Sequence, residues 1–322
     1  MKMKNAITAA LACVLAYAAI PAKAAETVQF GLIGAANSAE WQFYVGMKKG
    51  FFKEAGVDLD IIYVPTAPGL AQQLAAGSLD MIDIGAVEPI HAVARGAAVA
   101  IVRITGAVPL YELVASPKIN SLKDIKGHTV VIGGLVDINR VYLERALKAV
   151  GLKDSDIDIT VSGSTASRFA ALKSGTADMT MLAPPINFFA EAAGFKNVGM
   201  MIDYAKDLPF GATDVSLAYA GKHRDAVVHV RDAINKSIAW FLNDANRNEA
   251  IDILATEMKS NDRDSIAKSY DYLRKIGYFT TDDTVSRKSL EALMDEMTKI
   301  GDTDGKVPFD KLVLAGVTKV GK

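Results

Sequence analysis

The chain of 322 residues contains a single cysteine, Cys13, and only four histidines. One thiol excludes a fold that is held together by internal disulfides. No two histidines lie four positions apart, the spacing that sets two imidazoles on one helical face around zinc. The sequence therefore predicts neither a disulfide framework nor a metal site.

Short motifs of common nucleotide-dependent and hydrolytic enzymes are also missing. The chain has no GxGxxG turn, no GxxxxGK[ST] loop and no GxSxG elbow. Basic and acidic residues nearly balance, 36 against 37, whereas dedicated nucleic-acid binders usually carry a basic excess. We therefore expect no cofactor and no nucleic-acid partner.

The N-terminus has the pattern of an export signal. Lys2 and Lys4 precede an uncharged apolar run over residues 6–20, and Ala22-Lys23-Ala24 places small residues at the two positions that a signal peptidase reads. The run is shorter than the roughly 20 residues that a membrane-spanning helix needs. We therefore predict that residues 1–24 are a cleaved signal peptide and that the mature protein is soluble and periplasmic.

Cys13 allows a second interpretation, because lipoproteins are acylated at a cysteine. The usual leucine three residues earlier is replaced by Ala10, and Cys13 lies in the middle of the apolar run. We therefore favour cleavage after Ala24, which removes the only thiol of the chain.

Short apolar runs typical of strands alternate with helical segments through the first half of the chain, which predicts a mostly parallel sheet covered by helices. The expected strands are 28–33, 59–64, 81–86, 98–104, 129–132 and 157–161. The expected helices are 41–55, 69–76, 89–95 and 137–150. From about His223 the pattern changes to charged amphipathic helices without strands between them, expected over 224–243, 250–258, 265–276 and 286–300.

Residues 70–96 and 168–194 resemble each other without a gap. The identical pairs are Leu74/Leu172, Gly77/Gly175, Asp80/Asp178, Met81/Met179, Ala92/Ala190, Ala94/Ala192 and Gly96/Gly194. The repeated unit has the pattern of a helix that ends at a glycine, a turn and a buried strand. It predicts two similar α/β lobes.

Three segments carry a resemblance to a known family. Residues 46–58 read GMKKGFFKEAGVD, residues 74–85 read LAAGSLDMIDIG and residues 121–131 read SLKDIKGHTVV. They resemble the motifs A-x-x-K-G-F-F-x-x-x-G-L-D-V, L-x-x-G-x-x-D-x-x-x-x-G and S-x-x-D-L-K-G-K-x-V of the nitrate/sulfonate/taurine-type solute-binding proteins. This group is also named for its thiamine-pyrimidine members. The resemblance covers nearly all of the mature chain but does not identify a ligand.

The resemblance implies a type II periplasmic-binding-protein fold, with two α/β lobes, a hinge and a C-terminal helical segment. We expect lobe I over residues 25–107 and 213–322, and lobe II over residues 108–212. The resemblance further implies a subunit that delivers a small solute to the permease and ATPase of an ABC importer. We expect this subunit to be a monomer and not an enzyme. An enzyme or a pyrimidine-precursor-binding protein on the same fold is the alternative.

Ligands of open α/β sheets lie beyond the carboxyl ends of the strands, where helix N-termini point N–H groups into a crevice. Several loops expected at these ends carry polar side chains. The candidate ligand-binding residues are Asn37, Ser38, Trp41, Thr66, Glu88, Asp137, Arg140, Ser164, Thr165, Arg168, Asn187 and Asp214.

Arg140 and Arg168 both fall in the first turn of an expected helix, where the helix dipole disfavours a cation. A bound carboxylate or sulfonate would compensate, because a guanidinium fork suits a planar oxyanion. In the alternative interpretation, Arg140 pairs with Asp137 or Glu144, and Arg168 is solvated. We therefore expect the solute to be a small organic anion, such as a sulfonate or an aromatic carboxylate.

Two further candidates, Trp41 and Glu88, also have two interpretations each. Trp41 either stacks on an aromatic ligand or belongs to the core. Glu88 either contacts the ligand or caps its helix. The acidic side chains of Glu88 and Asp214 also leave open an amine or a pyrimidine as the ligand.

We expect hinge movement of the strands near residues 103–111 and 202–214 to close the lobes over the solute.

Overall fold

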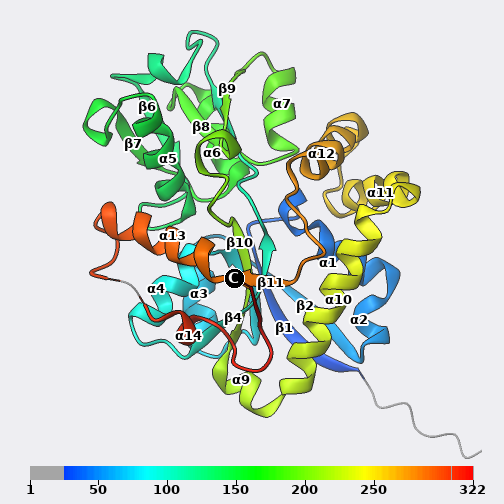
Figure 1. The fold of residues 1–322 in the computed structure, drawn as a ribbon. Helices are drawn as coiled ribbons and strands as arrows, with labels where there is room; N and C mark the ends of the chain where they lie inside the picture. Colours follow the sequence, from blue (N-terminus) through cyan, green and yellow to red (C-terminus); the bar gives the residue numbers. More distant parts are fainter. Residues whose placement is uncertain (1–24, 306, 322) are drawn as a thin grey trace, which may run out of the picture.

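A computed structural model describes residues 25–305 and 307–321 of the protein. The expected signal peptide, residues 1–24, lies outside the described residues. Figure 1 shows two α/β lobes, the first with blue and cyan strands and the second in green, flanked by the yellow and orange helices of the C-terminal part. In the described part of the chain, no helix is both long and apolar enough to cross a bilayer.

The first lobe is built on a five-stranded sheet in the order β2-β1-β3-β10-β4. Its strands are β1 (Glu26–Ile33), β2 (Val57–Val64), β3 (Met81–Gly85), β4 (Val99–Gly106) and β10 (Gly211–Ser216). Strand β1 is parallel to β2 and β3, whereas β10 is antiparallel to β3 and β4 because it returns from the second lobe. The expected lobe boundary at residue 213 therefore falls inside β10.

The second sheet has the same plan in the order β7-β6-β8-β5-β9. Its strands are β5 (Glu112–Ala115), β6 (Thr129–Ile132), β7 (Asp158–Val161), β8 (Met179–Leu182) and β9 (Lys196–Met200). Strand β6 is parallel to β7 and β8, and β5 is antiparallel to β8 and β9. Each sheet thus contains one antiparallel strand that follows a crossing from the other lobe.

Helices connect the strands of both lobes. They are α1 (Trp41–Lys49), α2 (Phe51–Glu54), α3 (Ala67–Ala75), α4 (Val87–Ala94), α5 (Ile138–Ala149), α6 (Thr165–Ser174), α7 (Ile186–Ala192) and α8 (Ile202–Ala205). The prediction of one helix over residues 41–55 was wrong. Gly50 adopts a left-handed conformation with φ of 75°, which ends α1 before α2 begins.

The internal repeat is confirmed in the secondary structure. Helix α6 and strand β8 begin 98 residues after α3 and β3. Asp80 Oδ2 accepts a hydrogen bond from the Gln29 backbone N–H at 2.9 Å, and Asp178 Oδ2 accepts one from the Thr129 backbone N–H at 3.0 Å. The repeated aspartates directly precede β3 and β8, and each therefore ties the start of that strand to the neighbouring parallel strand in the same way in both lobes.

The C-terminal part is largely helical, with α9 (Leu217–Lys222), α10 (Arg224–Leu242), α11 (Arg247–Glu257), α12 (Arg263–Ile276), α13 (Arg287–Lys299) and α14 (Phe309–Leu312). The prediction of no strands between these helices was wrong. Strands β11 (Thr284–Ser286) and β12 (Lys319–Gly321) pair in parallel. Three residues are too few for a strand period to stand out in a sequence.

The C-terminal helices touch both lobes. Helix α10 packs on α1 and α2 of the first lobe, and α12 packs on α7 of the second. The rings of Phe188 in α7 and Tyr272 in α12 meet edge to face at 6.2 Å. Arg145 Nε in α5 lies 3.0 Å from Glu296 Oε2 in α13. These contacts place helical supports on both flanks of the space between the lobes.

Candidate ligand-binding site

A cavity of about 410 Å³ lies between the lobes, at the carboxyl ends of strands from both sheets. Its polar wall residues are Asn37, Glu40, Asp83, Glu88, Asp137, Asn139, Ser164, Thr165, Ser167 and Arg168. Its larger apolar and aromatic wall residues are Ile33, Ile84, Tyr111, Ile138, Ile186, Phe210 and Met258. A cavity of this size and mixed lining can enclose one small organic molecule.

The lobes touch each other around this cavity. The Ser38 hydroxyl of the first lobe donates a hydrogen bond to the Pro184 carbonyl of the second. At Gly163 an added Cβ would lie 3.5 Å from the Pro65 carbonyl oxygen, and at Gly34 it would lie 3.4 Å from Ser164 Cβ. Segments of opposite lobes therefore lie next to each other at these two glycines, so the cavity is bounded on both sides.

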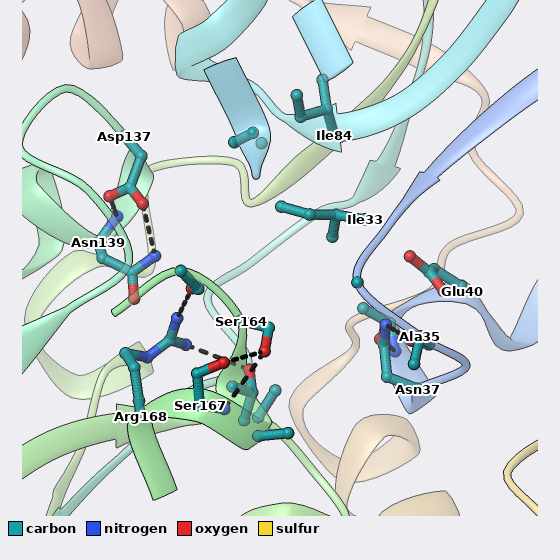
Figure 2. Close-up of a pocket in the computed structure, with 18 of the residues that line it drawn as sticks. Ile33, Ala35, Asn37, Glu40, Ile84, Asp137, Asn139, Ser164, Ser167 and Arg168 are labelled. Atoms are coloured by element: carbon teal, nitrogen blue, oxygen red, sulfur yellow. Dashed lines mark hydrogen bonds between the residues drawn. The ribbon is translucent and has the colours of Figure 1, made fainter. Parts of the chain in front are cut away.

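Arg168 is the basic side chain among the described cavity-lining residues, and it is almost fully buried. Its guanidinium donates to the carbonyl oxygens of Met181 at 3.1 Å and Gly163 at 2.6 Å, and to Thr165 Oγ1 at 3.1 Å. It also lies 5.5 Å from the centroid of the Tyr111 ring. Figure 2 shows Arg168 beside Ser164 and Ser167 at the start of α6. These three bonds use three of the five N–H groups of the guanidinium.

Asp137 lies at the start of α5, where its carboxyl group interacts with the charge of Arg168. Its Oδ1 accepts from the backbone N–H groups of Asn139 at 2.9 Å and Arg140 at 3.3 Å, so it is the N-cap of α5. Asn139 Nδ2 lies 3.4 Å from Asp137 Oδ2, the pair joined in Figure 2. Burial raises the pKa of Asp137 to about 6, against the opposing effect of the Arg168 charge.

The first lobe contributes three buried carboxyl groups to the cavity wall. Burial raises the pKa of Glu40 to about 8, although its carboxylate accepts a hydrogen bond from the Tyr44 hydroxyl at 2.6 Å. Burial likewise raises the pKa of Asp83 to about 7, against the two threonine hydroxyls that donate to it at 2.8 Å. The pKa of Glu88 is raised well above its ordinary value by burial and then by the charge of Asp137. This wall is therefore acidic in composition but favours protonated carboxyl groups.

The start of α6 supplies a different kind of wall. Ser164 is the N-cap, and its hydroxyl accepts from the Ser167 backbone N–H at 3.2 Å. Thr165 and Ala166 follow it in the first turn and line the cavity. Backbone N–H groups of a first turn have no partner within their helix, and the helix dipole makes this end positive. Together with Arg168, this end of α6 is suited to a negatively charged group.

The structure brings half of the sequence-derived candidates into one cavity wall. These are Asn37, Glu88, Asp137, Ser164, Thr165 and Arg168. The remaining candidates lie outside the cavity lining, and they are Ser38, Trp41, Thr66, Arg140, Asn187 and Asp214. The candidates inside the wall come from both lobes, which is why only the tertiary structure assembles them.

Trp41 belongs to the core, which is one of the two interpretations that the sequence allowed. It is fully buried, its Nε1 donates to the Ala250 carbonyl at 2.8 Å, and its ring packs against Phe241 at 5.1 Å and Tyr270 at 5.8 Å. The indole thus fastens α1 to the C-terminal helices. In this structure it cannot stack on a molecule in the cavity.

The side chain of Arg140 is paired with acidic residues, which is one of the two interpretations that the sequence allowed. Its guanidinium lies 3.4 Å from Glu144 Oε2, one helical turn away, and also bonds Asp154. Glu144 is one of the two partners that the sequence spacing offered, the other being Asp137. The backbone N–H of Arg140 still bonds Asp137, but its side chain extends away from the cavity lining.

Three other candidates have structural positions outside the lining. Thr66 is the N-cap of α3, with its hydroxyl 3.3 Å from the Gly69 backbone N–H. Asn187 is fully buried at the start of α7. Asp214 is buried in β10, and burial followed by the charges of Asp83 and Glu88 raises its pKa well above the ordinary value.

Sequence reasoning missed Glu40, Asp83, Tyr111 and Asn139 as cavity residues. Asp83 carried a usable signal, because a lone acid in the apolar run Met81-Ile82-Asp83-Ile84 marks a buried polar group. Asn139 and Glu40 lie next to candidate segments but carry no distinguishing pattern. Met258 reaches the cavity from the end of α11, which the sequence did not connect with the site. Among the described residues, no three potential ligands are grouped as a metal site requires.

Comparison with solved structures shows the same fold in transport proteins and in an enzyme. The periplasmic aliphatic sulphonate-binding protein SsuA from Escherichia coli is similar with a TM-score of 0.73 at 20% identity, over 92% of this chain and 94% of that chain. The desulfurization enzyme DSZB is similar with a TM-score of 0.67 at 13% identity, over 91% of this chain and 97% of that chain. At these identities the likeness establishes the type II periplasmic-binding-protein fold.

Two sequence relatives and one family model identify the family of this chain. The binding protein YtlA of Bacillus subtilis (strain 168) is 25% identical over 84% of this chain and 82% of its own length. A formylaminopyrimidine-binding protein of Halalkalibacterium halodurans is 26% identical over 73% of this chain and 71% of its own length. Residues 37–247 match the family described as NMT1/THI5-like, and these residues contain both five-stranded sheets apart from β1. The chain belongs to the NMT1/THI5-like family.

Proposed function

We propose that this protein is the solute-binding subunit of an ABC importer and that it captures a small organic anion between its lobes. The observation that carries this proposal is the buried Arg168 guanidinium, which lies in the wall of a cavity bounded by both lobes. A guanidinium beside a helix N-terminus favours an oxyanion. The sulphonate-binding protein among the structural neighbours supports the same solute class.

Capture on this proposal needs no chemical step. In an open form the lobes separate at the segments between β4 and β5 and between β9 and β10. A solute bound by both lobes then favours the closed form by its differential affinity for that form. The Ser38–Pro184 hydrogen bond and the Arg145–Glu296 ion pair contribute to the closed form, because each joins parts that would move apart.

Export to the periplasm and delivery to a membrane permease with its ATPase complete the proposal. The periplasmic location named for the SsuA neighbour supports the export that the N-terminal sequence predicts. A monomer suffices for this role, since one chain supplies both walls of the cavity.

A second candidate function is the binding of a pyrimidine precursor. The formylaminopyrimidine-binding relative favours it, as do the carboxyl groups of Glu40, Asp83 and Glu88 in the cavity wall. An enzyme on this fold is the third candidate, because DSZB has the same architecture. Product formation by the purified protein, without a transporter, would support the enzyme and contradict the non-enzymatic proposal.

The test begins with the purified protein and the molecule that it carries. Mass spectrometry after denaturation identifies the co-purified solute, and calorimetry with a panel of sulfonates, nitrate, aromatic carboxylates and pyrimidines measures affinities. We expect saturable binding of an organic anion and its loss on Arg168→Glu, with unchanged binding in Arg140→Glu as the matched control. Binding of pyrimidines alone, or equal affinity in the Arg168 variant, would contradict the anion proposal.

A further inference from the structure

A group of buried polar side chains lies where α12 of the C-terminal part meets the second lobe. Its members are Glu112 at the start of β5, Asn187 in the first turn of α7 and Tyr272 in α12. All three are buried, and Glu112 Oε2, Asn187 Oδ1 and Nδ2 and the Tyr272 hydroxyl have no hydrogen-bond partner among the described residues. Such atoms raise the free energy of the packed contact, because each has lost water without gaining a protein partner.

The three side chains are close enough to act on one another. Phe188, the neighbour of Asn187, meets the Tyr272 ring edge to face at 6.2 Å. Burial and then the charge of Glu112 raise the pKa of Tyr272. The Asn187 amide lowers the pKa of Glu112, although the two groups form no hydrogen bond of normal geometry. Charges and dipoles shift a pKa in this way only from nearby, so the three residues form one group, the Glu112 cluster.

The Glu112 cluster joins parts of the molecule that separate when the lobes open. Helix α12 is fastened to the first lobe, because the Tyr270 ring packs on Trp41 at 5.8 Å and the Tyr270 hydroxyl donates to the Phe241 carbonyl at 2.7 Å. Figure 1 shows the other side of α12 beside α7 of the second lobe. Glu112 follows the crossing from β4 and pairs with Met200, the last residue of β9 before the return crossing. The cluster therefore lies at the hinge and at a contact between the lobes.

The Glu112 carboxyl group titrates near neutral pH in this closed arrangement. Burial raises its pKa from 4.5 to about 7, the Asn187 amide opposes the rise, and the carboxyl group of Glu191 in α7 adds to it. When α12 moves away, water reaches the carboxyl group and the pKa returns toward its ordinary value. The closed form then binds more protons than the open form between pH 4.5 and about 7, so closure weakens as pH rises through this range.

Other charged groups around the cluster do not compensate an ionised Glu112. Asp203 of α8 is a further acid, and its charge also raises the pKa of Tyr272. Lys196 of β9 donates to Asn120 Oδ1 at 2.7 Å, so its ammonium group is held at another place. The negative charge of Glu112 therefore has acidic neighbours as long as the contact is closed.

We propose that Glu112, Asn187 and Tyr272 form a proton-dependent latch between α12 and the second lobe, which holds the lobes together when Glu112 is protonated and releases them when it is ionised. The inference rests on the lobe movement of the proposed function, but it does not depend on which solute the cavity binds. It assigns control of closure to a contact that lies outside the cavity lining.

The test measures closure by trapping the closed form with a disulfide bond. A Cβ added at Gly34 lies 3.4 Å from Ser164 Cβ, close to the separation in a disulfide. The expected mature chain has no thiol of its own. The mature chain with Gly34→Cys and Ser164→Cys, dialysed free of solute and treated with a mild oxidant, therefore forms this bond at a rate that reports the closed fraction. Non-reducing gels measure the rate.

Glu112→Gln in the same double-cysteine chain isolates the proton effect. The glutamine has the same size and cannot ionise, while the reactivity of the two thiols and the strain at the left-handed Gly34 are common to both proteins. We expect the ratio of trapping rates, variant over original, to rise three-fold or more from pH 6 to pH 8. The pKa difference between about 7 and 4.5 allows about ten-fold. A smaller rise overturns the inference.

Two further variants assign the effect to the cluster. Tyr272→Phe removes a buried hydroxyl without a partner and leaves Glu112 in place, so we expect trapping to be at least two-fold faster at both pH values. Glu144→Gln is the matched control, because Glu144 also lies beside a second acid, Asp154, but within the second lobe. Its ratio should stay constant with pH. Unchanged trapping in Tyr272→Phe, or an equal rise of the ratio in the control, would overturn the assignment. Melting curves confirm that each variant folds.

The experiment separates this inference from the proposed function. If calorimetry finds an anion that binds and needs Arg168, but the trapping ratio does not rise with pH, only the latch fails. If the ratio rises as expected and no small molecule of the panel binds, the latch stands and the proposed solute class fails.

Discussion

The two repeat units share a backbone plan but carry different residues at two equivalent positions. With the offset of 98 residues, Arg168 in α6 corresponds to Leu70 in α3, and Glu88 in α4 corresponds to Ile186 in α7. Leu70 is a fully buried core residue of the first lobe, and Ile186 lines the cavity from the second. The scaffold therefore tolerates either an apolar or a charged side chain at these positions, and the charged choice differs between the lobes.

This difference gives the cavity two unlike walls. The first lobe contributes Glu40, Asp83 and Glu88, whereas the second contributes Arg168 and the start of α6. Asp137 of the second lobe stands beside Arg168 and moderates its charge. The duplicated α/β unit thus gives both lobes the same backbone arrangement. The residues at single positions determine which wall of the cavity favours which end of a ligand. The following variants test this difference between the two walls of the cavity.

The acidic first-lobe wall predicts a strong pH dependence of stability. The pKa of Glu40 is raised from 4.5 to about 8 in the folded state, so between these values the folded chain binds more protons than the unfolded chain. The free energy of unfolding then falls as pH rises, by about 1.4 kcal/mol per pH unit. We expect the titration of Glu40 to lower the free energy of unfolding by about 3 kcal/mol between pH 5.5 and pH 7.5. Urea denaturation at the two pH values measures this change.

Glu40→Gln checks the cause, because a glutamine cannot titrate and still accepts a hydrogen bond from the Tyr44 hydroxyl. We expect a shallower fall in unfolding free energy with pH in this variant. Identical pH profiles for both proteins would show that the Glu40 carboxyl is not held protonated.

Arg168→Leu gives the second lobe the residue that the first lobe has at the equivalent position. Removal of a buried guanidinium that contacts the solute is expected to weaken binding about 100-fold, because close charge pairs are worth several kcal/mol in complexes. Calorimetry with the co-purified solute measures this effect, and a melting curve confirms that the variant folds. Unchanged affinity would mean that the two walls do not differ in function.

Ser38→Ala tests the contact that joins the walls rather than either wall alone. Loss of the hydrogen bond to the Pro184 carbonyl is worth about 1 kcal/mol, so we expect roughly five-fold weaker solute binding through a less stable closed form. Small-angle scattering with saturating solute should show a larger radius of gyration. Ser269→Ala is the control, because its hydroxyl bonds the Ser265 carbonyl within α12. An equal loss in both variants would contradict a specific role in closure.

Arg140→Gln has the smallest expected effect and sharpens the contrast with Arg168. Its ion pairs with Glu144 and Asp154 lie outside the cavity lining, so solute affinity should stay within two-fold of the original. Partly exposed ion pairs contribute about 0–1 kcal/mol to stability. A marked loss of affinity in calorimetry would return Arg140 to the list of binding residues.

Much of the framework followed from sequence patterns that act over short distances. Strand β6 and the start of α10 lie where apolar runs and helical periodicity predicted them, and the repeat predicted the matching positions of α3 and α6. Gly50 carried the signal for the break between α1 and α2, but its left-handed conformation depends on the packing of both helices. The short pair β11–β12 gave no signal, because it exists only through contact between distant segments.

The sequence alone determined the α/β class, the two related units, the helical C-terminal part and the family, because periodicity, glycine positions and motifs are local properties of the chain. It could not separate Arg168 from Arg140, since both occupy a first helical turn and differ only in what surrounds them. Tertiary structure decided that Arg140 pairs with Glu144 while Arg168 enters the cavity wall. It also decided that Trp41 is a core residue and that Glu88 and Asn139, from different lobes, line the same cavity. Side-chain partners depend on which segments the fold brings together, and two lobes are brought together only in three dimensions.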